Sequence, residues 1–479
     1  MPLSLRRALL LGFSLSLGLV GIAESTVARA ADAAAKDKNW DEAKRILARI
    51  KEPKFPKHDF SIIDSGAVGD GKADCTEALK KAIAACHAAG GGRVIVPAGN
   101  FLTGAVHLLS NVNLHLEKGA TLQFKTDPKA YLPVVFCRWE GIECMNYSPF
   151  IYAFEQENIA VTGQGTLDGS ASAENWWAWA RKHEDRTSDA TPAVKKMVEM
   201  GDKKVPVKER IFGEGSFLRP NFFEPCRCRN VMIEGVTINR SPMWEINPVL
   251  CTNVIVRGVT IVTDGPNNDG CDPEACRDVL IEDCSFTTGD DCIAIKSGRN
   301  DDGRRVGVPC ENLVIRRCRM QDGHAGVAIG SEISGGCRNV FIEDCTMDSP
   351  HLERALRLKS NARRGGVIEN IYMRNVQIGS VAEALLTVDL LYEEGAKGDF
   401  PPVVRNVYID HVTSKSSPRL FFMVGFKAAT IDNINVSHST FEGVDATELM
   451  NNVGKVTLND VTIVPLKKTR SLSSREGPP

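Results

Sequence analysis

One short phrase of residues recurs nine times between Arg229 and Ile463. Each copy begins with a polar anchor and places mostly apolar residues at offsets +1, +3, +6 and +8 from it. Successive anchors are 23, 25, 34, 27, 31, 36, 27 and 22 residues apart and stand at Asn230, Asn253, Asp278, Asn312, Asn339, Asn370, Asn406, Asn433 and Lys455. A fixed phrase with variable spacers predicts one repeated structural unit that carries loops of different length.

The offsets within the phrase predict two short β-strands joined by a corner. Apolar residues at +1 and +3, and again at +6 and +8, alternate as they do in strands that bury every second side chain. Helical repeats would need longer amphipathic runs, and propeller blades would need four antiparallel strands joined by hairpin turns. The phrase therefore predicts an all-β fold, a single-stranded right-handed parallel β-helix, whose coils stack about 4.8 Å apart.

The segment that precedes the repeats predicts a cap for the coil stack. Asp74, followed by Glu77, resembles a capping box at the start of a helix that runs to about Ala89. A solenoid must cover its terminal coil, so we expect this N-terminal capping helix to close the open end. Residues 31–57 are expected to form a short helix and a linker before it.

The β-helix domain is predicted to span residues 58–465, with one long interruption. Residues 170–217 hold three tryptophans and many charges and break the rhythm of the coils, so they predict an inserted, partly helical excursion. Residues 466–479 are basic and rich in serine, a composition typical of a disordered tail.

The first 30 residues predict export from the cytoplasm. Arg6 and Arg7 precede an apolar run, and Ala28-Arg29-Ala30 offers a small-x-small cleavage site. The apolar run is too short for a membrane span, so residues 1–30 are interpreted as a signal peptide. We therefore expect a secreted or periplasmic protein with no membrane partner, exported by either the general secretory or the twin-arginine route.

Charge limits the partners that the exported chain can attract as a whole. Removal of residues 1–30, with three Arg and one Glu, changes the formal net charge from −2 to −4. No overall attraction to nucleic acid is expected, and an acidic ligand must be met by a local cluster of cations.

The cysteines follow the repeat and predict a reduced core. Eight of the 15 lie either two residues before or six residues after an anchor, where Cys acts as a small buried hydrophobe. The sequence leaves open disulfides among Cys75, Cys86, Cys137, Cys144 and Cys226.

Polar residues depart from the phrase on consecutive coils and fall in register. Asp290 and His324 each lie 12 residues after the anchor of their own coil, and Asp269 lies 16 after its anchor. Equal offsets place side chains next to each other on stacked coils, so we expect these three on one face. Arg357 and Lys359 continue the row on a further coil.

This row has the chemistry of glycoside hydrolysis. Carboxylates on adjacent coils raise one another's pKa, so one can stay protonated as an acid while another is ionised as a base. We expect the pKa of Asp290, which lies between Asp269 and His324, to be raised. Arg357 and Lys359 suit an anionic sugar.

At these residues the sequence resembles the polygalacturonase family, glycoside hydrolase family 28. The family motifs Asn-Thr-Asp, Gly-Asp-Asp, Gly-His-Gly and Arg-Ile-Lys correspond, in that order, to Asn267-Asn268-Asp269, Gly289-Asp290-Asp291, Gly323-His324-Ala325 and Arg357-Leu358-Lys359. The resemblance implies cleavage of α-1,4-linked galacturonic acid in polygalacturonate, with inversion and without a cofactor. The extra methyl of Ala325 is expected to narrow a subsite beside His324.

The resemblance also implies roles for single residues. Asp290 would be the general acid, Asp269 and Asp291 would hold and deprotonate the attacking water, and His324 would support the acid. Substrate binding would fall to residues of the Asn-Thr-Asp and Arg-Ile-Lys motifs and to a basic stretch similar to that of bacterial exo-acting members: Asn267, Arg357, Lys359, Lys296, Arg299, Arg304 and Arg305. In this interpretation the excursion and the stretch at 298–309 flank the cleft and favour exo action.

Three other functions fit the same fold. A rhamnogalacturonan hydrolase would share the acidic pair, although Arg357 and Lys359 favour galacturonate. A pectate lyase would bind Ca²⁺ through clustered carboxylates, and a surface β-helix would bind glycans without turnover. No His, Cys or Asp cluster has clean ligand spacing in the sequence, so no metal is predicted. Endo or exo action and the oligomeric state stay open.

Overall fold

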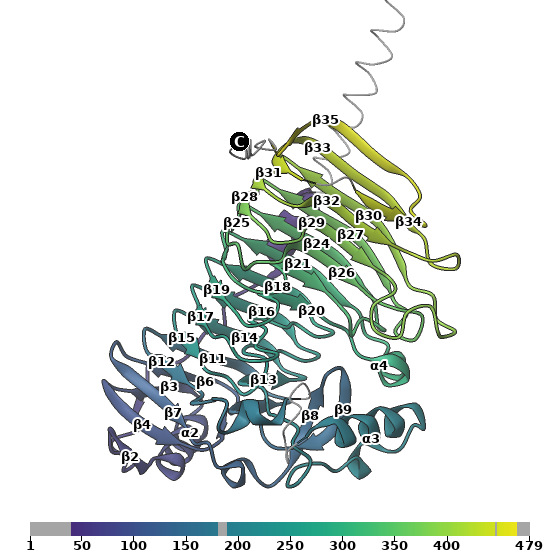
Figure 1. Ribbon diagram of the computed structural model, residues 1–479. Helices are drawn as coiled ribbons and strands as arrows, with labels where there is room; N and C mark the ends of the chain where they lie inside the picture. The colour runs from purple at the N-terminus through teal and green to yellow at the C-terminus, as the bar shows by residue number, and fades with distance from the viewer. Residues whose placement is uncertain (1–39, 181–188, 446–447, 467–479) are drawn as a thin grey trace, which may run out of the picture. The chain divides into compact units, whose positions relative to one another are not determined.

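The computed structural model describes residues 40–180, 189–445 and 448–466, and these fall into two compact units, residues 1–49 and 50–479. Within the described part of the first unit, residues 40–49 form a helix. In the described chain no helix is long and apolar enough to cross a membrane. Within the second unit, parallel strands stack from β2 and β4 at one end to β35 at the other (Figure 1).

Each coil contributes one strand to the first of three parallel ladders, and this strand carries the +1 and +3 residues of the phrase. The ladder runs through β1 (Asp59–Ser61), β3 (Gly92–Val96), β6 (Val112–Leu116), β11 (Glu157–Gly163), β14 (Arg229–Glu234), β16 (Thr252–Arg257), β18 (Arg277–Glu282), β21 (Cys310–Arg316), β24 (Cys337–Glu343), β27 (Val367–Arg374), β30 (Val403–Asp410), β33 (Ile431–Val444) and β35 (Val456–Pro465).

The second ladder carries the +6 and +8 residues. It consists of β2 (Asp70–Asp74), β4 (Gly99–Thr103), β7 (Ala120–Phe124), β12 (Thr166–Asp168), β15 (Thr237–Asn239), β17 (Thr260–Val262), β19 (Ser285–Thr287), β22 (Arg319–Met320), β25 (Thr346–Met347), β28 (Gln377–Ser380) and β31 (Thr413–Ser416), which ends against β33. The predicted parallel β-helix is confirmed, with two strands and a corner in each copy of the phrase.

A third ladder follows the second in most coils and was not visible in the phrase. Its strands are β5 (Val106–His107), β10 (Ile151–Phe154), β13 (Phe223–Cys226), β20 (Ile293–Ile295), β23 (Val327–Ile329), β26 (Arg354–Lys359), β29 (Ala384–Asp389), β32 (Arg419–Val424) and β34 (Leu449–Asn451). Single bridges through Ile246 and Cys271 connect β13 to β20. The variable spacers of the sequence precede or follow these strands.

Two positions with a left-handed backbone, the anchor and the corner residue five positions after it, keep the spacing of the phrase the same in all copies from offset 0 to +8. Anchors from Asn230 to Asn433 have a left-handed backbone with φ of 55 to 62°, which Asn and Asp tolerate better than other non-glycine residues. From Asn312 onward each anchor amide donates to the preceding anchor. We call Asn312, Asn339, Asn370, Asn406 and Asn433 the asparagine ladder, whose successive amide-to-carbonyl distances are 2.7–3.2 Å.

The corner residue lies five positions after each anchor and is also left-handed. Its φ values run from 46° at His438 to 77° at Gly235. Because the backbone turns there, the two strands of one copy belong to different ladders. The side chain at this position points out of the coil, so it is free to vary in type.

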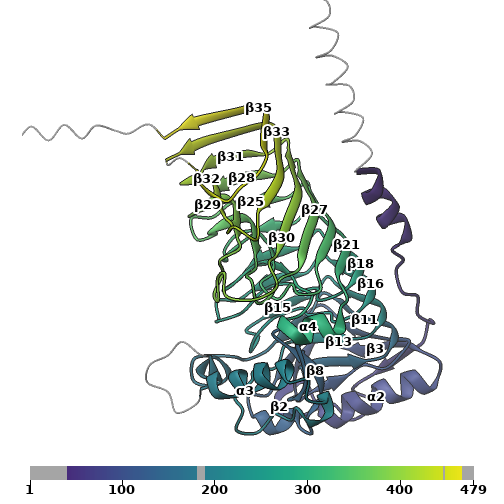
Figure 2. The ribbon, with the colours of Figure 1, turned by 90° about the vertical axis from the view of Figure 1, so that its right-hand side faces the viewer.

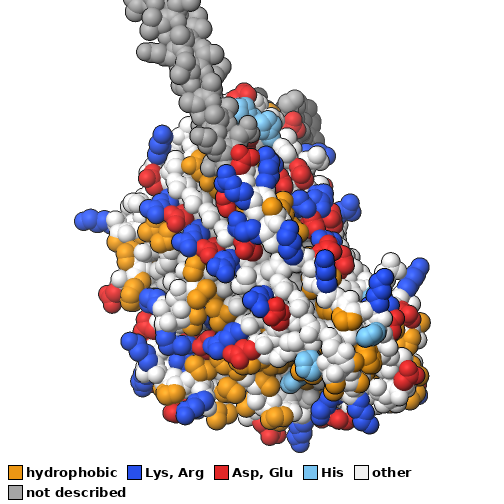
Figure 3. All heavy atoms as spheres, turned by 180° about the vertical axis from the view of Figure 1, so that it is seen from behind, with side chains coloured by type: hydrophobic (Ala, Val, Ile, Leu, Met, Phe, Trp, Pro, Cys, Tyr) orange, Lys and Arg blue, Asp and Glu red, His pale blue; other side chains and the backbone are white. Residues whose placement is uncertain are grey.

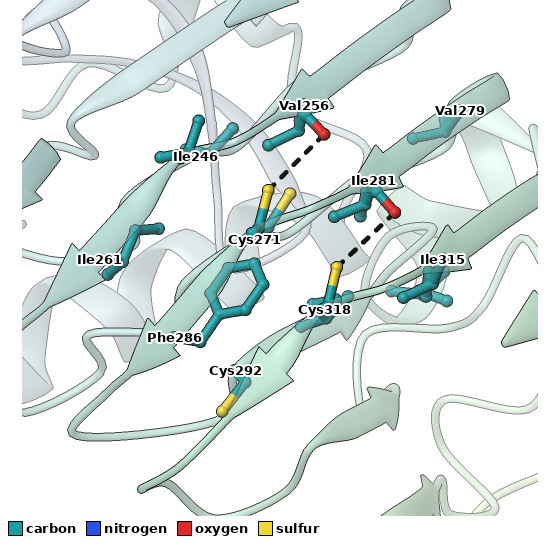
Figure 4. Packing of buried hydrophobic residues seen from close by; sticks show 14 of the residues in the cluster. Ile246, Val256, Ile261, Cys271, Val279, Ile281, Phe286, Cys292, Ile315 and Cys318 are labelled. Atoms are coloured by element: carbon teal, nitrogen blue, oxygen red, sulfur yellow. Dashed lines mark hydrogen bonds between the residues drawn. The ribbon is translucent and has the colours of Figure 1, made fainter. Parts of the chain in front are cut away.

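The interior of the coils is apolar and contains stacked thiols. All 15 cysteines are buried and none forms a disulfide, as the repeat positions predicted. The Cys276 thiol donates to the carbonyl of Pro248 at 3.1 Å. Figure 4 shows the thiol of Cys318, which donates to the carbonyl of Ile281 at 3.8 Å. Cys137 and Cys144 face each other across a hairpin with sulfurs 3.8 Å apart.

The capping helix is confirmed, with a different start. Helix α2 spans Thr76–Ala88 and buries one apolar side into the core. Asp74 lies before the helix and accepts hydrogen bonds from the Thr76 amide and hydroxyl, at 3.0 and 2.6 Å, so the predicted capping box with Glu77 is not formed. The N-cap position is occupied by Cys75, so Asp74 lies one residue too early to cap the helix.

Several elements leave the coils beside the third ladder. Between β7 and β10 lie η1 (Pro128–Tyr131) and an antiparallel hairpin of β8 (Val135–Trp139) and β9 (Ile142–Asn146). Between β12 and β13 lie η2 (Trp176–Trp179), α3 (Thr191–Asp202) and η3 (Val207–Glu209). Helix α4 (Asn300–Val306) follows β20. Helix α3 packs against α4 and β9, as Figures 1 and 2 show. The hairpin and α4 were not predicted. On the face seen in Figure 3, acidic and basic side chains are interspersed with apolar ones.

Candidate active site

The predicted row of polar residues lies at the start of the third ladder. Asp290 precedes β20, His324 precedes β23, and Arg357 and Lys359 lie within β26. Because β20, β23 and β26 pair in register, their flanking residues meet on one side. These residues line a cleft of about 620 Å³. We call Asp269, Asp290, Asp291, His324, Arg357 and Lys359 the cleft row.

Asp290 and His324 are direct partners, as their equal offsets predicted. The His324 Nδ1 lies 2.8 Å from Asp290 Oδ1, and the His324 amide donates to the Asp290 carbonyl at 3.1 Å. The hydrogen bond to Asp290 raises the pKa of His324 to about 9. Burial alone would raise the pKa of Asp290, but the hydrogen bond and charge of His324, with Lys359, bring it below its usual range. The prediction of a raised pKa for Asp290 was therefore wrong.

The carboxyl of the cleft row whose pKa is raised most clearly is that of Asp269. Oxygens of Asp269, Asp290 and Asp291 lie within 4.8 Å of one another. Burial, followed by the charge of Asp290, raises the pKa of Asp269 to about 8. The sequence could not foresee this reversal, because offsets place Asp290 beside His324 but give neither the hydrogen bond of 2.8 Å between them nor the burial of Asp269.

Lys296 joins the cluster from the end of β20. Its amine is 3.6 Å from Asp269, 3.3 Å from Asp272 and 3.5 Å from Glu332, and it lies 4.4 Å from the ring centre of Trp244. Although burial opposes it, the charges of Asp272 and Asp269 raise the pKa of Lys296 above its usual value. The lysine is a fixed cation in the floor of the cleft.

Arg357 and Lys359 place two more cations beside Asp291. The Lys359 amine is 2.7 Å from Asp291 Oδ2, and an Arg357 guanidinium nitrogen is 3.7 Å from Asp291 Oδ1. Both cations lie near the ring of Tyr392, at 5.5 and 5.6 Å from its centre. Nearly all of Lys359 is buried, so its charge acts at low dielectric on any anion that enters.

Asn267 lies in the cleft, while the three arginines of the basic stretch do not line it. Asn267 accepts a hydrogen bond from Arg219 at 2.6 Å. Arg299 pairs with Glu140 at 2.7 Å and lies behind the cleft wall. Its role is to hold Glu140 rather than to offer an open guanidinium.

Arg304 and Arg305 are held elsewhere by α4, so the prediction that they bind substrate is wrong. Arg304 donates to the carbonyls of Arg363 and Arg364 at 2.9 Å and covers the ring of Phe400 at 3.6 Å. Arg305 donates to Asp302 at 2.8 Å and contacts Glu143. The helix thus directs Arg304 to backbone carbonyls and Arg305 to carboxylates, and these contacts occupy both guanidinium groups.

Ala325 is buried and clusters with Ala294 and Ala328, apart from the large apolar core. Ala294 and Ala328 alternate with residues that face the core, and Ala328 pairs with Arg357 on the neighbouring strand. The methyl group of Ala325 therefore belongs to the layer under the cleft row and is not itself exposed in the cleft.

Sequence reasoning missed most of the cleft wall. Trp244, Glu332, Glu353, Tyr392 and Glu393 come from the third-ladder side of the coils, and Glu140 comes from the turn between β8 and β9. Short apolar runs after each catalytic motif, such as Ile293–Ile295, were the available signal for the third ladder. Nothing in the phrase located the hairpin.

Two groups in the described residues offer at least three metal-ligating atoms to one point. One is Asp269, Asp290 and Asp291, and the other is Asp410, His411 and His438. The first group is already neutralised, with Lys359 at 2.7 Å and the His324 imidazole at 2.8 Å from its oxygens. Cations in those positions disfavour Ca²⁺, which takes six to eight oxygen ligands.

The fold and the site together define a parallel β-helix protein of the carbohydrate-active type, with adjacent carboxyls and buried cations in one cleft. The chain belongs to glycosyl hydrolases family 28, whose family model matches residues 214–463. The match covers all four motifs of the cleft row.

Relatives and solved structures agree with this family. A probable polygalacturonase of Vitis vinifera is 31% identical over 67% of this chain and 60% of its own length, and an exo-poly-alpha-D-galacturonosidase of Dickeya chrysanthemi is 26% identical over 80% and 62%. The chain thus spans about three fifths of these two relatives. The crystal structure of a hyperthermoactive exopolygalacturonase from Thermotoga maritima superposes with a TM-score of 0.86 at 43% identity, over 88% of this chain and 96% of that one.

Proposed function

We propose that this protein hydrolyses α-1,4 bonds between galacturonic acid residues of polygalacturonate. The observation that carries the proposal is the contact of two buried carboxyls and one half-buried carboxyl with a histidine and three cations in one cleft. Carboxyls supply acid and base for glycoside hydrolysis, and buried cations select a sugar that bears a carboxylate. Similarity to the exopolygalacturonase of Thermotoga maritima supports the same substrate.

Within this proposal, His324 and Asp290 act as the proton-donating pair. The protonated imidazole donates to Asp290 at 2.8 Å, so the pair keeps a proton next to the leaving oxygen of a bound sugar. Asp269 and Asp291 face the same space and hold the attacking water. Asp291 accepts the proton that the water loses, because the raised pKa of Asp269 keeps that carboxyl protonated. Asp269 and Asp290 are so close that they titrate as a pair.

Inversion of configuration is proposed from family membership. The nearest oxygens of the three aspartates lie within 4.8 Å, which is shorter than the separation of about 6.5–9.5 Å usual between inverting carboxyl groups. The first product of a fast reaction, followed by proton NMR, tests the point. A β-anomer as the first product supports inversion, and an α-anomer would contradict it.

We propose exo action because elements outside the coils add to the cleft wall. Glu140 comes from the β8–β9 turn and Ala180 from the excursion, and both line the cleft. Walls at one end of a cleft favour binding of a chain terminus. Monogalacturonate as the main product from the first minutes, with slowly falling viscosity, is the expected result. An early ladder of oligomers with a rapid fall in viscosity would show endo action.

A chelator distinguishes the proposed hydrolase from the alternative, a calcium-dependent lyase. The hydrolase should keep its activity in excess EDTA and form no product with the absorbance of an unsaturated uronate. Loss of activity that Ca²⁺ restores, together with this absorbance, would overturn the proposal. Equal turnover of rhamnogalacturonan would point to the other hydrolase, and no turnover of any pectic polymer to a glycan-binding β-helix.

We also propose that the protein acts outside the cytoplasm, without a nucleic-acid or membrane partner. The predicted signal peptide at residues 1–30 supports this, and it lies outside the described residues. Fractionation of expressing cells with an antibody against the β-helix tests it. Full-length protein confined to the cytoplasm would contradict it.

A further inference from the structure

Two histidines and an aspartate converge on the C-terminal coils, apart from the cleft. Asp410 ends β30, His411 forms the corner that follows, and His438 forms the same corner one coil later, within β33. One oxygen of Asp410 and one ring nitrogen of each histidine lie within 4.8 Å of one another. None of the three lines the cleft. Histidine side chains also gather near the top of the face in Figure 3, at the level of these coils.

The fold holds these side chains together through strand register. Asp410 pairs with Ser437 across β30 and β33, which places His411 and His438 on neighbouring coils. Both histidines have a left-handed backbone, with φ of 51° and 46°. The same corner geometry recurs along the whole stack, so the two imidazoles project from fixed points rather than from flexible loops.

Both imidazoles contact the carboxylate of Asp410. The Nδ1 atoms of His411 and His438 lie 2.9 and 2.8 Å from the two oxygens of Asp410, and the rings stack with centres 5.0 Å apart. The Ser437 hydroxyl donates to Asp410 at 2.6 Å and fixes the carboxylate. Two nitrogen donors and one oxygen donor thus face a common point.

We propose that Asp410, His411 and His438 bind one divalent transition-metal ion, of the class of Zn²⁺, Ni²⁺ and Cu²⁺. Imidazole nitrogens suit these ions, whereas Ca²⁺ and Mg²⁺ select all-oxygen sites. The ion replaces the proton that each Nδ1 shares with Asp410, so both rings bind as neutral imidazoles with their proton on Nε2. Water completes the coordination, since both histidine side chains are at least 38% exposed.

Closing the site needs little movement. Ligand atoms about 2.0–2.1 Å from one tetrahedral ion lie about 3.3 Å from one another, so each Nδ1, now 2.9 or 2.8 Å from an Asp410 oxygen, must move away from that oxygen by roughly half an ångström. Rotation of two exposed rings achieves this and leaves the paired strands in place. The ion would then link two consecutive coils near the end of the stack, where Leu458 and Ile463 of β35 are 46% and 38% exposed.

The consequence is a metal-dependent stability of the terminal coils that does not involve the cleft. An ion that binds only the folded chain raises the midpoint of thermal unfolding, by at least about 2 °C once its concentration well exceeds Kd. Catalysis, which takes place in the cleft row, is unaffected by the same ion at the same concentration.

The test uses the untagged full chain, stripped with EDTA and dialysed, and titrated with NiSO₄ or ZnCl₂ by calorimetry and thermal unfolding. The test variant is His411→Asn with His438→Asn, because Asn375 occupies the same corner with φ 53° and shows that Asn fits there. The control is His58→Asn, which removes an exposed histidine far away in sequence. We expect one equivalent to bind the wild type and the control, and at least tenfold weaker binding by the double variant.

Two results would overturn the inference. One is equal metal affinity, or an equal rise of the unfolding midpoint, in wild type and double variant. The other is loss of binding in Asp269→Asn with the histidines intact, which would place the ion in the cleft. Unfolding midpoints of both variants without metal, compared with that of the wild type, show whether the substitutions leave the fold unchanged.

Discussion

The asparagine ladder and the cleft row overlap on the coils of Asn312 and Asn339, yet the hydrogen-bonding needs of their polar groups are met differently. In the ladder each side-chain amide donates to the carbonyl oxygen of the preceding asparagine at 2.7–3.2 Å. In the cleft row, Asp291 Oδ1 and Arg357 Nε are buried without a hydrogen-bond partner. A buried polar atom without a partner costs about 1–3 kcal/mol. The asparagine ladder therefore stabilises the fold, whereas the unpaired atoms of the cleft row destabilise it.

The largest effect on activity should come from substitution of Asp290, which belongs to the proton-donating pair of the cleft row. Asp290→Asn keeps the shape of the side chain but removes the proton-accepting and proton-donating carboxyl, so kcat on polygalacturonate should fall by at least about 10²-fold. Far-UV circular dichroism should be unchanged. Asp344→Asn is the matched control, because Asp344 lies at a corner where Asn is also found. Near-wild-type turnover of the first variant would remove Asp290 from the mechanism.

A smaller loss should follow from removal of one cation. Lys359→Met preserves length but deletes the charge 2.7 Å from Asp291. A charged hydrogen bond is worth about 1.5–3 kcal/mol, so kcat/KM on polygalacturonate should fall about 10- to 100-fold. Lys427→Met, at an exposed lysine, should have no effect. Equal kinetics for both variants would assign Lys359 to structure alone.

The asparagine ladder should show the reverse pattern. Asn339→Ala removes two amide hydrogen bonds at a residue with φ 58°, and should lower the free energy of unfolding by about 1–3 kcal/mol while kcat stays unchanged. Asn339→Gly, which accepts the same φ, should lose less. Denaturant unfolding and initial rates measure the two quantities. A fall in kcat with unaltered stability would abolish the distinction between the two rows.

The smallest effect should be a dependence of stability on pH. The pKa of His324 is about 9 in the folded chain against 6.5 for a free histidine, so the stability it contributes is complete below 6.5 and is lost as pH rises toward 9. The pKa of Asp269, raised to about 8, acts in the same direction. The unfolding midpoint should therefore fall between pH 6.5 and 9, and fall less in His324→Gln. An identical slope in that variant would contradict the assignment.

The sequence predicted what depends on local spacing and missed what depends on long-range contacts. The two strands of the phrase, the corner and the thiol columns follow from alternation, and Asp290 and His324 were placed together by their equal offsets. The pKa order of Asp269 and Asp290 depends on the burial of both groups and on the hydrogen bond from His324, which spacing does not give. The positions of Arg304 and Arg305 depend on contacts with Phe400 and Glu143, which are distant in sequence and meet these arginines only in the folded chain.

The histidine pair shows what a closer count of the phrase would have found. His411 and His438 both stand five residues after their anchors, Asn406 and Asn433. That offset is occupied by Gly, Asp, Arg or Asn in other coils, so no single copy draws attention to it. Two metal-ligating residues at one offset of successive copies become visible only when the copies are aligned to one another.

The corners and anchors fix each coil from offset 0 to +8, and all the length variation of the repeat falls after them. Spacings of 22 to 36 residues are therefore absorbed beside the third ladder, where the cleft lies. An insertion on that side lengthens the wall of a binding site without disturbing the pairing of any neighbouring coil. Replacement of the segments that form the cleft wall, in evolution or by design, can therefore change which polymer is bound while the stacked coils stay the same.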